Sequence, residues 1–187
     1  MIYKSEPIEQ QAAMRAVELM AAAARTAPKA CAVDAIETLV LDGEDKDRLT
    51  AAMRALAEET GAKYYARDAG NVDACHCLLL IGVRPAPRRL NCALCGVENC
   101  AKAAENRIPC ALAVTDLGIA VGSAGAIAMD HRIDNRILFT AGMAALRQKL
   151  FSDEVTICYG FGLAVTGKNV FFDRAEQKRH NGESFSD

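Results

Sequence analysis

The sequence predicts an α+β domain in which helices cover a small sheet. Segments with apolar residues at helical spacing alternate with short, nearly continuous apolar segments, the pattern of helices interleaved with buried strands. The chain has 187 residues, enough for one full-sized domain and too few for two comfortable ones. Hydrophobic residues make up 51% and charged residues 25%, as in ordinary globular proteins, so most of the chain is expected to be ordered.

Two helices and a strand are predicted in the N-terminal third of the chain. Residues 8–24 carry apolar side chains at helical spacing. This helix ends before Pro28, because the residue preceding a proline is pushed out of helical geometry. Residues 35–41 predict a strand that ends at a turn. Residues 45–59 predict a second amphipathic helix, which stops at Gly61.

The middle of the chain predicts a short strand over residues 63–66 and a longer one over residues 75–83. The longer segment is almost entirely apolar, which is typical of a fully buried central strand. Residues 112–130 predict a helix whose small residues allow close packing, so we expect it to be central. The remaining predicted elements are a strand over residues 137–140, a helix over 143–150 and a strand over 155–160.

Charge and composition argue against several classes of protein. The chain has 24 acidic and 22 basic side chains, a net charge of −2, whereas a nucleic-acid-binding surface normally shows as a basic excess. The first apolar run contains Glu18, which a secretory signal does not normally tolerate. The longest low-polarity stretch, residues 117–129, is shorter than the ~18–20 residues of a membrane span. We therefore expect a cytoplasmic protein that binds neither nucleic acid nor a membrane.

Eight cysteines, no tryptophan and only 5% aromatic residues make the composition unusual. Thiols stay reduced in the cytoplasm, so clustered cysteines indicate metal or redox chemistry. Cys92, Cys95, Cys100 and Cys110 all lie within residues 84–110, a proline-punctuated segment with little apolar periodicity. We expect this segment to be an insertion that is organised by something other than a hydrophobic core.

The four cysteines are spaced C-x2-C-x4-C-x9-C, which suits a metal centre with four thiolate ligands. Two thiolates two residues apart can bind one centre from a single turn. Gly96 lets the backbone reverse so that Cys100 joins from the other side, and a short helical turn after Cys100 would bring Cys110 back as the fourth ligand. Four cysteine thiolates are the ligand set of a 4Fe–4S cluster.

Two alternatives to an iron–sulfur cluster stay open. A zinc site with four cysteine ligands uses the same groups, but it usually pairs two C-x-x-C knuckles across a longer gap, and this segment has one knuckle. The four cysteines could also bind no metal, although a polar, proline-punctuated segment offers them no core to fill. The spacing favours the cluster.

The cysteine spacing resembles that of known ferredoxin-type domains. Cys92-x2-Cys95-Gly96-x3-Cys100 with a later Pro-Cys pair is similar to the small domain of acetyl-CoA synthase and of Rnf-type electron-transport subunits. The longer context resembles a family of uncharacterised ferredoxin-domain proteins found mostly in anaerobes. The stretches that carry this resemblance are residues 24–29, 90–100, 116–124, 133–137 and 165–174. The resemblance implies a 4Fe–4S cluster held by the four cysteines.

The order of predicted elements is similar to that of the nitroreductases. This resemblance implies a nitroreductase-like α+β scaffold, a homodimer and an FMN at the subunit interface. The chain has no counterpart of the arginine-rich segment with which nitroreductases hold the FMN phosphate, and a fold analogy does not establish a flavin site. We expect one nitroreductase-like domain over residues 1–175, with residues 84–110 as the inserted metal-binding segment, and a flexible tail over residues 176–187.

Other candidate sites are weaker. Residues 162–169 fall one residue short of a P-loop, because the Ser or Thr that binds Mg²⁺ is missing. What remains is a speculative anion or flavin-phosphate site at Lys168, against the alternative of a solvated lysine in a turn. Cys75 and Cys77 flank His76 on the predicted strand and are expected to be core residues, as is Cys158. No catalytic triad or paired-carboxylate set can be assembled, so catalytic residues stay unknown.

Arg84, Arg88 and Arg89 lead directly into the cysteine segment. Positive charge near a four-thiolate cluster would raise its reduction potential and steer an acidic partner, and ordinary solvated arginines are the alternative. The sequence thus predicts an iron–sulfur protein that passes single electrons, with a redox partner such as a ferredoxin. Two other functions stay open: an FMN-dependent reductase fed by the cluster, and a non-catalytic module with a structural zinc or iron–sulfur site.

Overall fold

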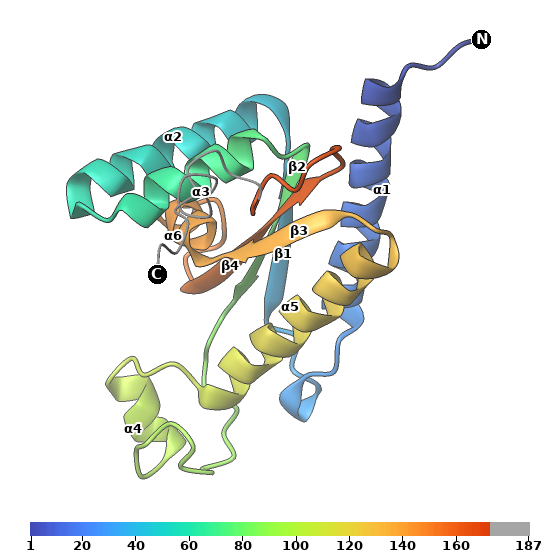
Figure 1. Cartoon of the computed structure of the whole chain (residues 1–187). Helices are drawn as coiled ribbons and strands as arrows, with labels where there is room; N and C mark the ends of the chain where they lie inside the picture. Colours follow the sequence, from blue (N-terminus) through green and yellow to red (C-terminus); the bar gives the residue numbers. More distant parts are fainter. Residues whose placement is uncertain (173–187) are drawn as a thin grey trace, which may run out of the picture.

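A computed structural model describes residues 1–172 as helices packed on both faces of a small sheet (Figure 1). The predicted tail, residues 176–187, lies outside the described residues. The helices are α1 (Ser5–Thr26), α2 (Gly43–Thr60), α3 (Lys63–Asp73), α4 (Cys100–Glu105), α5 (Ala111–Asp130) and α6 (Phe139–Arg147), with a short 3₁₀ turn, η1, at Ala30–Ala32. The strands are β1 (Ile36–Leu41), β2 (Cys77–Val83), β3 (Asp134–Leu138) and β4 (Ile157–Ala164).

The sheet is antiparallel throughout, with strand order β1-β2-β4-β3. Every residue of β2 is buried, so the apolar run is an inner strand, as its composition predicts. β2 and β4 run in opposite directions, and Cys77 pairs with Leu163 while Val83 pairs with Ile157. Antiparallel pairing with helices on both faces confirms the α+β class.

Two hydrophobic cores lie on opposite faces of the sheet. Leu79 and Ile81 of β2 face the core shared with α1 and α5, whereas Leu78 and Leu80 face the core shared with α2, α3 and α6. This alternation follows from the two-residue period of a strand. Figure 1 shows the two layers, with α1 and α5 on one side of the sheet and α2, α3 and α6 on the other.

The segment over residues 63–66, which the sequence predicts as a strand, is instead the start of α3. Its helical face consists of Tyr65, Ala69 and Val72, which are all buried. These positions are separated by four and three residues, the spacing of one helix face, and they complete the core under α2. The local preference of the two tyrosines for a strand is overridden by this packing.

The elements predicted near the C-terminus are present, but their bounds differ. The strand predicted over residues 137–140 is β3 and ends at Leu138, and the helix predicted over residues 143–150 is α6 and begins at Phe139. Thr140 and Ala141 are already buried in α6, because the helix must start there to cover β4. β4 itself continues to Ala164 rather than ending at residue 160.

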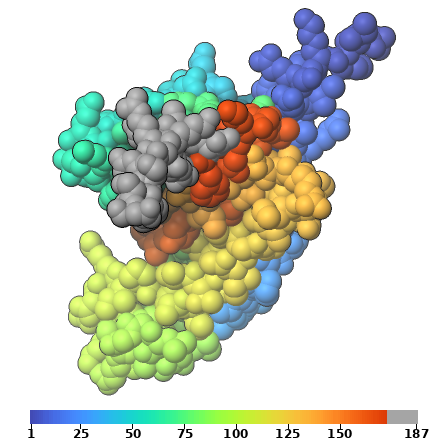
Figure 2. Space-filling view, in the orientation of Figure 1, coloured from blue at the N-terminus to red at the C-terminus, as the bar shows by residue number. Residues whose placement is uncertain are grey.

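The cysteine segment (residues 84–110) begins directly after β2 and ends directly before α5. Apart from α4 it has no helix or strand. Figure 2 shows it as a yellow-green lobe that projects from one end of the molecule. The lobe buries Ala103 and Cys110 but leaves Leu90 and Leu94 exposed, so it has almost no hydrophobic core of its own.

α5 is apolar around most of its circumference. Among the described residues it is the one helix that is long and apolar enough to cross a membrane by length and composition. It packs along α1 and the sheet (Figure 1). Its outward face leaves Val114, Ile119 and Met129 exposed, together with Gly118 and Gly122, where an added Cβ would meet nothing.

Candidate metal centre

All four cysteines of the predicted ligand set line one pocket in the cysteine segment. Cys92 and Cys95 lie in its irregular part, Cys100 is the first residue of α4, and Cys110 is the N-cap of α5. The pocket has an empty volume of about 290 Å³, open solvent included. Its wall is completed mainly by apolar side chains of the lobe and of the first turn of α5. The spacing of the cysteines therefore brings four thiols to one cavity.

Backbone N–H groups point at the sulfurs of this pocket. The Asn91 N–H donates to Cys100 Sγ over 3.4 Å, and the Ala111 N–H donates to Cys95 Sγ over 3.2 Å. The Asn91 side chain accepts a hydrogen bond from the Cys100 N–H over 3.0 Å, which fixes the start of α4 against residue 91. Donors aimed at sulfur stabilise a thiolate, the form in which cysteine binds metals.

Cys110 has the clearest electrostatic signature of the four. Burial alone would raise the pKa of the thiol, but hydrogen bonds from the backbone N–H groups of Ala113, Arg88 and Leu112 outweigh this effect. The positive charge of Arg88 acts in the same direction, and the net effect lowers the pKa of Cys110. The start of α5 supplies two of these donors, as helix N-termini do for anionic groups.

The backbone around the cysteines turns repeatedly through left-handed conformations. The φ angles are +60° at Arg89, +48° at Asn91, +58° at Ala93 and +76° at Gly96. Gly96 adopts this conformation easily, as the sequence predicts, whereas each of the other three is strained by roughly 1–3 kcal/mol. Left-handed residues between right-handed ones turn successive N–H groups inward and form the anion-binding nests found at iron–sulfur sites. Asn91, one of these left-handed residues, donates its N–H to the sulfur of Cys100.

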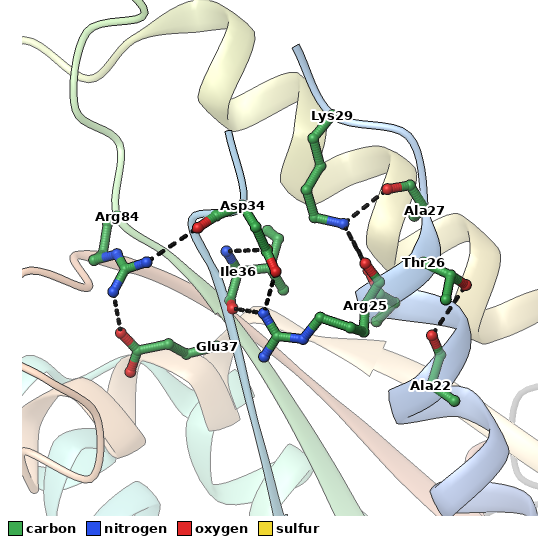
Figure 3. Close-up of polar contacts among 10 residues, drawn as sticks. Ala22, Arg25, Thr26, Ala27, Lys29, Asp34, Ile36, Glu37 and Arg84 are labelled. Carbon is green, nitrogen blue, oxygen red and sulfur yellow. Dashed lines mark hydrogen bonds and ion pairs between the residues drawn. The ribbon is translucent and has the colours of Figure 1, made fainter. Parts of the chain in front are cut away.

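The three arginines at the entrance of the segment have different environments. Arg84 donates to Glu37 and to the backbone carbonyl of Asp34 (Figure 3), so it ties the start of the lobe to β1 and the loop before it. Arg89 is exposed. Arg88 is buried and lies in the wall of the cysteine pocket. The alternative of ordinary solvated arginines thus holds for Arg89 and is wrong for Arg88.

Arg88 forms a buried ion pair with Asp116 of α5. Its Nη2 atom lies 3.0 Å from Asp116 Oδ2, and the two side chains are 3% and 4% exposed. The other carboxylate oxygen, Oδ1, accepts from the Ala30 N–H over 2.8 Å. Sequence reasoning does not identify this pair as part of the site. The sequence does contain one indication of it: Asp116 is the only charged residue of the apolar helix α5 before its last position, so it needs a partner when the helix is buried.

The sulfurs do not form a single-ion site. Within residues 1–172, no three His, Cys, Asp or Glu side chains form a group that could hold one metal ion. A tetrahedral zinc site would require four sulfurs about 2.3 Å from one point. A 4Fe–4S cluster has four metal atoms, one for each of its four thiolates.

Lys168 does not contribute to the cysteine pocket. It lies in the loop after β4, which leaves the sheet beside the start of β2, whereas the cysteine segment leaves beside the end of β2. The seven residues of β2 separate the two ends by roughly 20 Å. Lys168 is exposed.

The other four cysteines lie outside this pocket. Cys75, Cys77 and Cys158 are buried, as predicted, whereas Cys31 is exposed. Burial raises the pKa of each of these three thiols to about 12, so they stay protonated at neutral pH. His76 accepts a hydrogen bond from the Val165 N–H at Nδ1 over 3.3 Å and has a structural role between β2 and the loop after β4.

Comparison with known proteins gives both a family and a fold. A family model described as "Uncharacterized protein containing a ferredoxin domain (DUF2148)" matches residues 107–174, which include Cys110. An uncharacterized protein of Archaeoglobus fulgidus is 35% identical over 187 residues, covering 95% of this chain and 100% of the relative.

Solved structures with a similar fold include proteins described as containing FMN. A nitroreductase with bound FMN from Desulfitobacterium hafniense has a TM-score of 0.59 at 15% identity, covering 82% of this chain and 78% of its own. An oxidoreductase containing FMN also has a TM-score of 0.59, at 13% identity, with 82% of this chain and 67% of its own covered. At these identities the similarity shows that the chain has the nitroreductase fold, as the order of its elements predicts.

Proposed function

The chain belongs to the family of uncharacterized proteins containing a ferredoxin domain, and from that premise we propose that it is an iron–sulfur protein that transfers single electrons. The proposed ligands of its 4Fe–4S cluster are Cys92, Cys95, Cys100 and Cys110. The observation that carries the proposal is that these four thiols line one pocket. A cluster bound there would supply a one-electron redox centre.

The residues around the pocket suit this group. The hydrogen bonds from Asn91 and Ala111 to the sulfurs of Cys100 and Cys95 would stabilise the negative charge of the thiolates and orient them. Such outer contacts tune the affinity and the reduction potential of a metal centre. The lobe has little core and several strained residues, so the bound cluster would also stabilise its fold.

The proposal includes a reducing cellular environment and a redox partner. All eight cysteines are free thiols, which is the usual state of cysteine in the cytoplasm. The pocket lies in a lobe at the surface of the molecule (Figure 2), so a cluster there would be close to a docked protein. A ferredoxin is the partner class that we propose as the electron donor.

We also propose that the protein is a homodimer. The support is the outward face of α5, where Val114, Ile119 and Met129 are exposed beside the bare backbone of Gly118 and Gly122. A helix that is apolar on all sides is normally buried. A second copy of the same face would cover it, since two-fold contacts join identical surfaces.

A flavin-dependent reductase is the second candidate function. Its support is the fold, since solved structures with this fold are described as containing FMN. In such an enzyme the cluster would pass electrons to a flavin, and Lys168 is the proposed contact for the flavin phosphate. FMN released by heating the purified protein would favour this function over a pure electron carrier.

The test is metal and flavin analysis of protein purified without oxygen. We expect about four irons and four inorganic sulfides per chain and a broad absorption near ~400 nm that bleaches on reduction. Cys100→Ala and Cys110→Ala should each lose most of the iron. Cys31→Ala is the matched control, because Cys31 is exposed and outside the pocket, and it should retain the wild-type iron content.

Three outcomes would contradict the proposal. Stoichiometric zinc without iron would point to a structural zinc module instead. Protein that binds neither metal under these conditions would leave the cysteines without the proposed role. Full iron content in Cys110→Ala would show that the ligand set is wrong even if a cluster is present.

A further inference from the structure

Arg88 is a buried guanidinium that is only partly satisfied by the protein. Arginine is almost never fully buried unless it is paired, and here the side chain is 3% exposed. Its Nη2 donates to Asp116 Oδ2 over 3.0 Å, and its Nη1 donates to the Ala86 carbonyl over 3.4 Å. Its Nε is buried and has no hydrogen-bond partner within residues 1–172.

A buried N–H without an acceptor is unfavourable, and native structures rarely leave one unexplained. The missing acceptor must lie close to Nε, and Arg88 is one of the residues that line the same pocket as the four cysteines. The backbone of Arg88 also acts on this pocket, since its N–H helps to lower the pKa of the Cys110 thiol. An acceptor that occupies the pocket would therefore meet both the backbone and the side chain of this residue.

Asp116 holds the guanidinium in this position from a different part of the fold. One carboxylate oxygen binds Arg88 and the other accepts from the Ala30 N–H in the turn after α1. Both oxygens are thus engaged, which fixes the direction of the carboxylate and of the planar guanidinium paired with it. The negative charge of Asp116 also offsets much of the positive charge of Arg88, so the direction of the N–H groups matters more than the net charge.

We propose that Arg88 donates a hydrogen bond from Nε to a sulfur of the bound cluster, and that Asp116 is the positioning residue that aims it. This inference rests on the proposed function, because it requires a cluster in the pocket. A donor at sulfur stabilises the reduced cluster, which carries one more negative charge than the oxidised cluster. The pair therefore raises the reduction potential, and it couples the cluster to the turn at residue 30.

The experiment is a redox titration of iron-loaded protein, followed by electron paramagnetic resonance. Arg88→Met removes the donor and the charge while keeping an unbranched chain, and we expect its midpoint potential to fall by at least 59 mV, a tenfold change in a one-electron equilibrium. Arg88→Lys keeps the charge but lacks Nε, so its midpoint potential should lie between those of the wild type and Arg88→Met. Asp116→Asn removes a negative charge, which by itself raises the potential, so the positioning role of Asp116 is read from the arginine hydrogen bond instead: the ¹⁵N coupling described below should be lost in this variant.

Arg89→Met is the matched control, since Arg89 is the adjacent arginine and is exposed. The midpoint potential of the Arg89→Met protein should stay within a few millivolts of the wild-type value. An Arg88→Met protein with full iron content and the wild-type potential would overturn the inference and leave the proposed function intact. Wild-type protein without iron would contradict the proposed function and this inference together.

A second measurement uses the wild-type protein and does not depend on the folding of any variant. Protein with ¹⁵N-labelled arginine side chains is reduced, and pulsed electron paramagnetic resonance is used to detect nitrogen coupled to the cluster. We expect a weak ¹⁵N coupling from one arginine that is absent from labelled Arg88→Lys protein. No ¹⁵N coupling in the reduced wild type would overturn the hydrogen bond.

Discussion

The surroundings of each sulfur separate the cysteines into different chemical classes. Backbone N–H groups face the sulfurs of Cys95, Cys100 and Cys110 in the pocket. By contrast, Cys75 and Cys158 are enclosed by apolar groups of the core, which raise the pKa of each thiol to about 12. The same residue type is therefore placed where a thiolate is favoured in the lobe and kept protonated in the sheet.

The buried thiols make the stability of the protein depend on pH in alkaline solution. Cys75, Cys77 and Cys158 have pKa values of about 12 in the folded protein, above the ordinary value of 9.0. Between pH 9 and pH 12 the unfolded chain releases protons that the folded chain retains. The free energy of unfolding should therefore fall as pH rises, by up to ~1.4 kcal/mol per pH unit for each thiol.

Cys158→Ala isolates one of these contributions. In urea denaturation at a series of pH values, we expect its stability to fall less steeply above pH 9 than that of the wild type, by up to ~1.4 kcal/mol per pH unit. Val155→Ala is the control, because Val155 is buried in the same core and has no titratable group. It should lower stability equally at every pH. Parallel curves for Cys158→Ala and the wild type would contradict the assignment.

The contact between α6 and β4 depends on a glycine. A Cβ added at Gly142 would lie 1.9 Å from the carbonyl oxygen of Cys158, far inside van der Waals contact and against backbone that cannot rotate away. The low aromatic content of the chain has a structural counterpart here, because small residues let the helix backbone lie directly on the strand. α6 is thus placed by backbone contact rather than by large side chains.

Gly142→Ala should lower the free energy of unfolding by ~3 kcal/mol, the upper end of the usual range for overpacked positions. Chemical denaturation monitored by circular dichroism measures it. Gly70→Ala is the matched control, because Gly70 is in α3 and an added Cβ there meets nothing. That variant should be more stable than the wild type by ~0.5–1 kcal/mol, since alanine favours the helix. Equal effects of the two substitutions would refute the close contact.

The difference between predicted and observed elements is largest where tertiary packing decides the local structure. The sequence predicts a strand over residues 63–66, because this short window contains two tyrosines and no clear helical period, whereas the structure has the start of α3 there. Its helical face becomes evident only when Tyr65, Ala69 and Val72 are seen to pack together under α2. The long periodic helices α1, α2 and α5 were predicted closely, because each carries several turns of pattern.

On the scale of the whole molecule, the exposed apolar face of α5 is a feature outside the lobe that the single chain leaves uncovered. It presents Ile119 and Met129, which are 40% and 67% exposed, on either side of Gly122. Burial of such a face by a second copy is the basis of the proposed dimer. A charge placed in the middle of the face would have to be desolvated in that dimer, which is unfavourable without a partner.

Gly122→Glu tests the dimer. An added side chain meets nothing in the single chain, so the fold should be retained. Size-exclusion chromatography with light scattering should give twice the chain mass of 20.0 kDa for the wild type and the single mass for the variant. Gly70→Glu, on the opposite layer of the sheet, should remain dimeric. A monomeric wild type would contradict the dimer, and loss of dimer in both variants would contradict its location at α5.

The sequence by itself determined the α+β class, the long helices, the inner position of β2 and the four cysteines that share one pocket. These features follow from local spacing, which each segment carries without reference to the others. Only the tertiary structure decided that Arg88 is buried against Asp116, 28 positions away, and that Asp116 is held by Ala30, 86 positions away. Such pairs depend on how the lobe and α5 meet, and no local pattern records that contact.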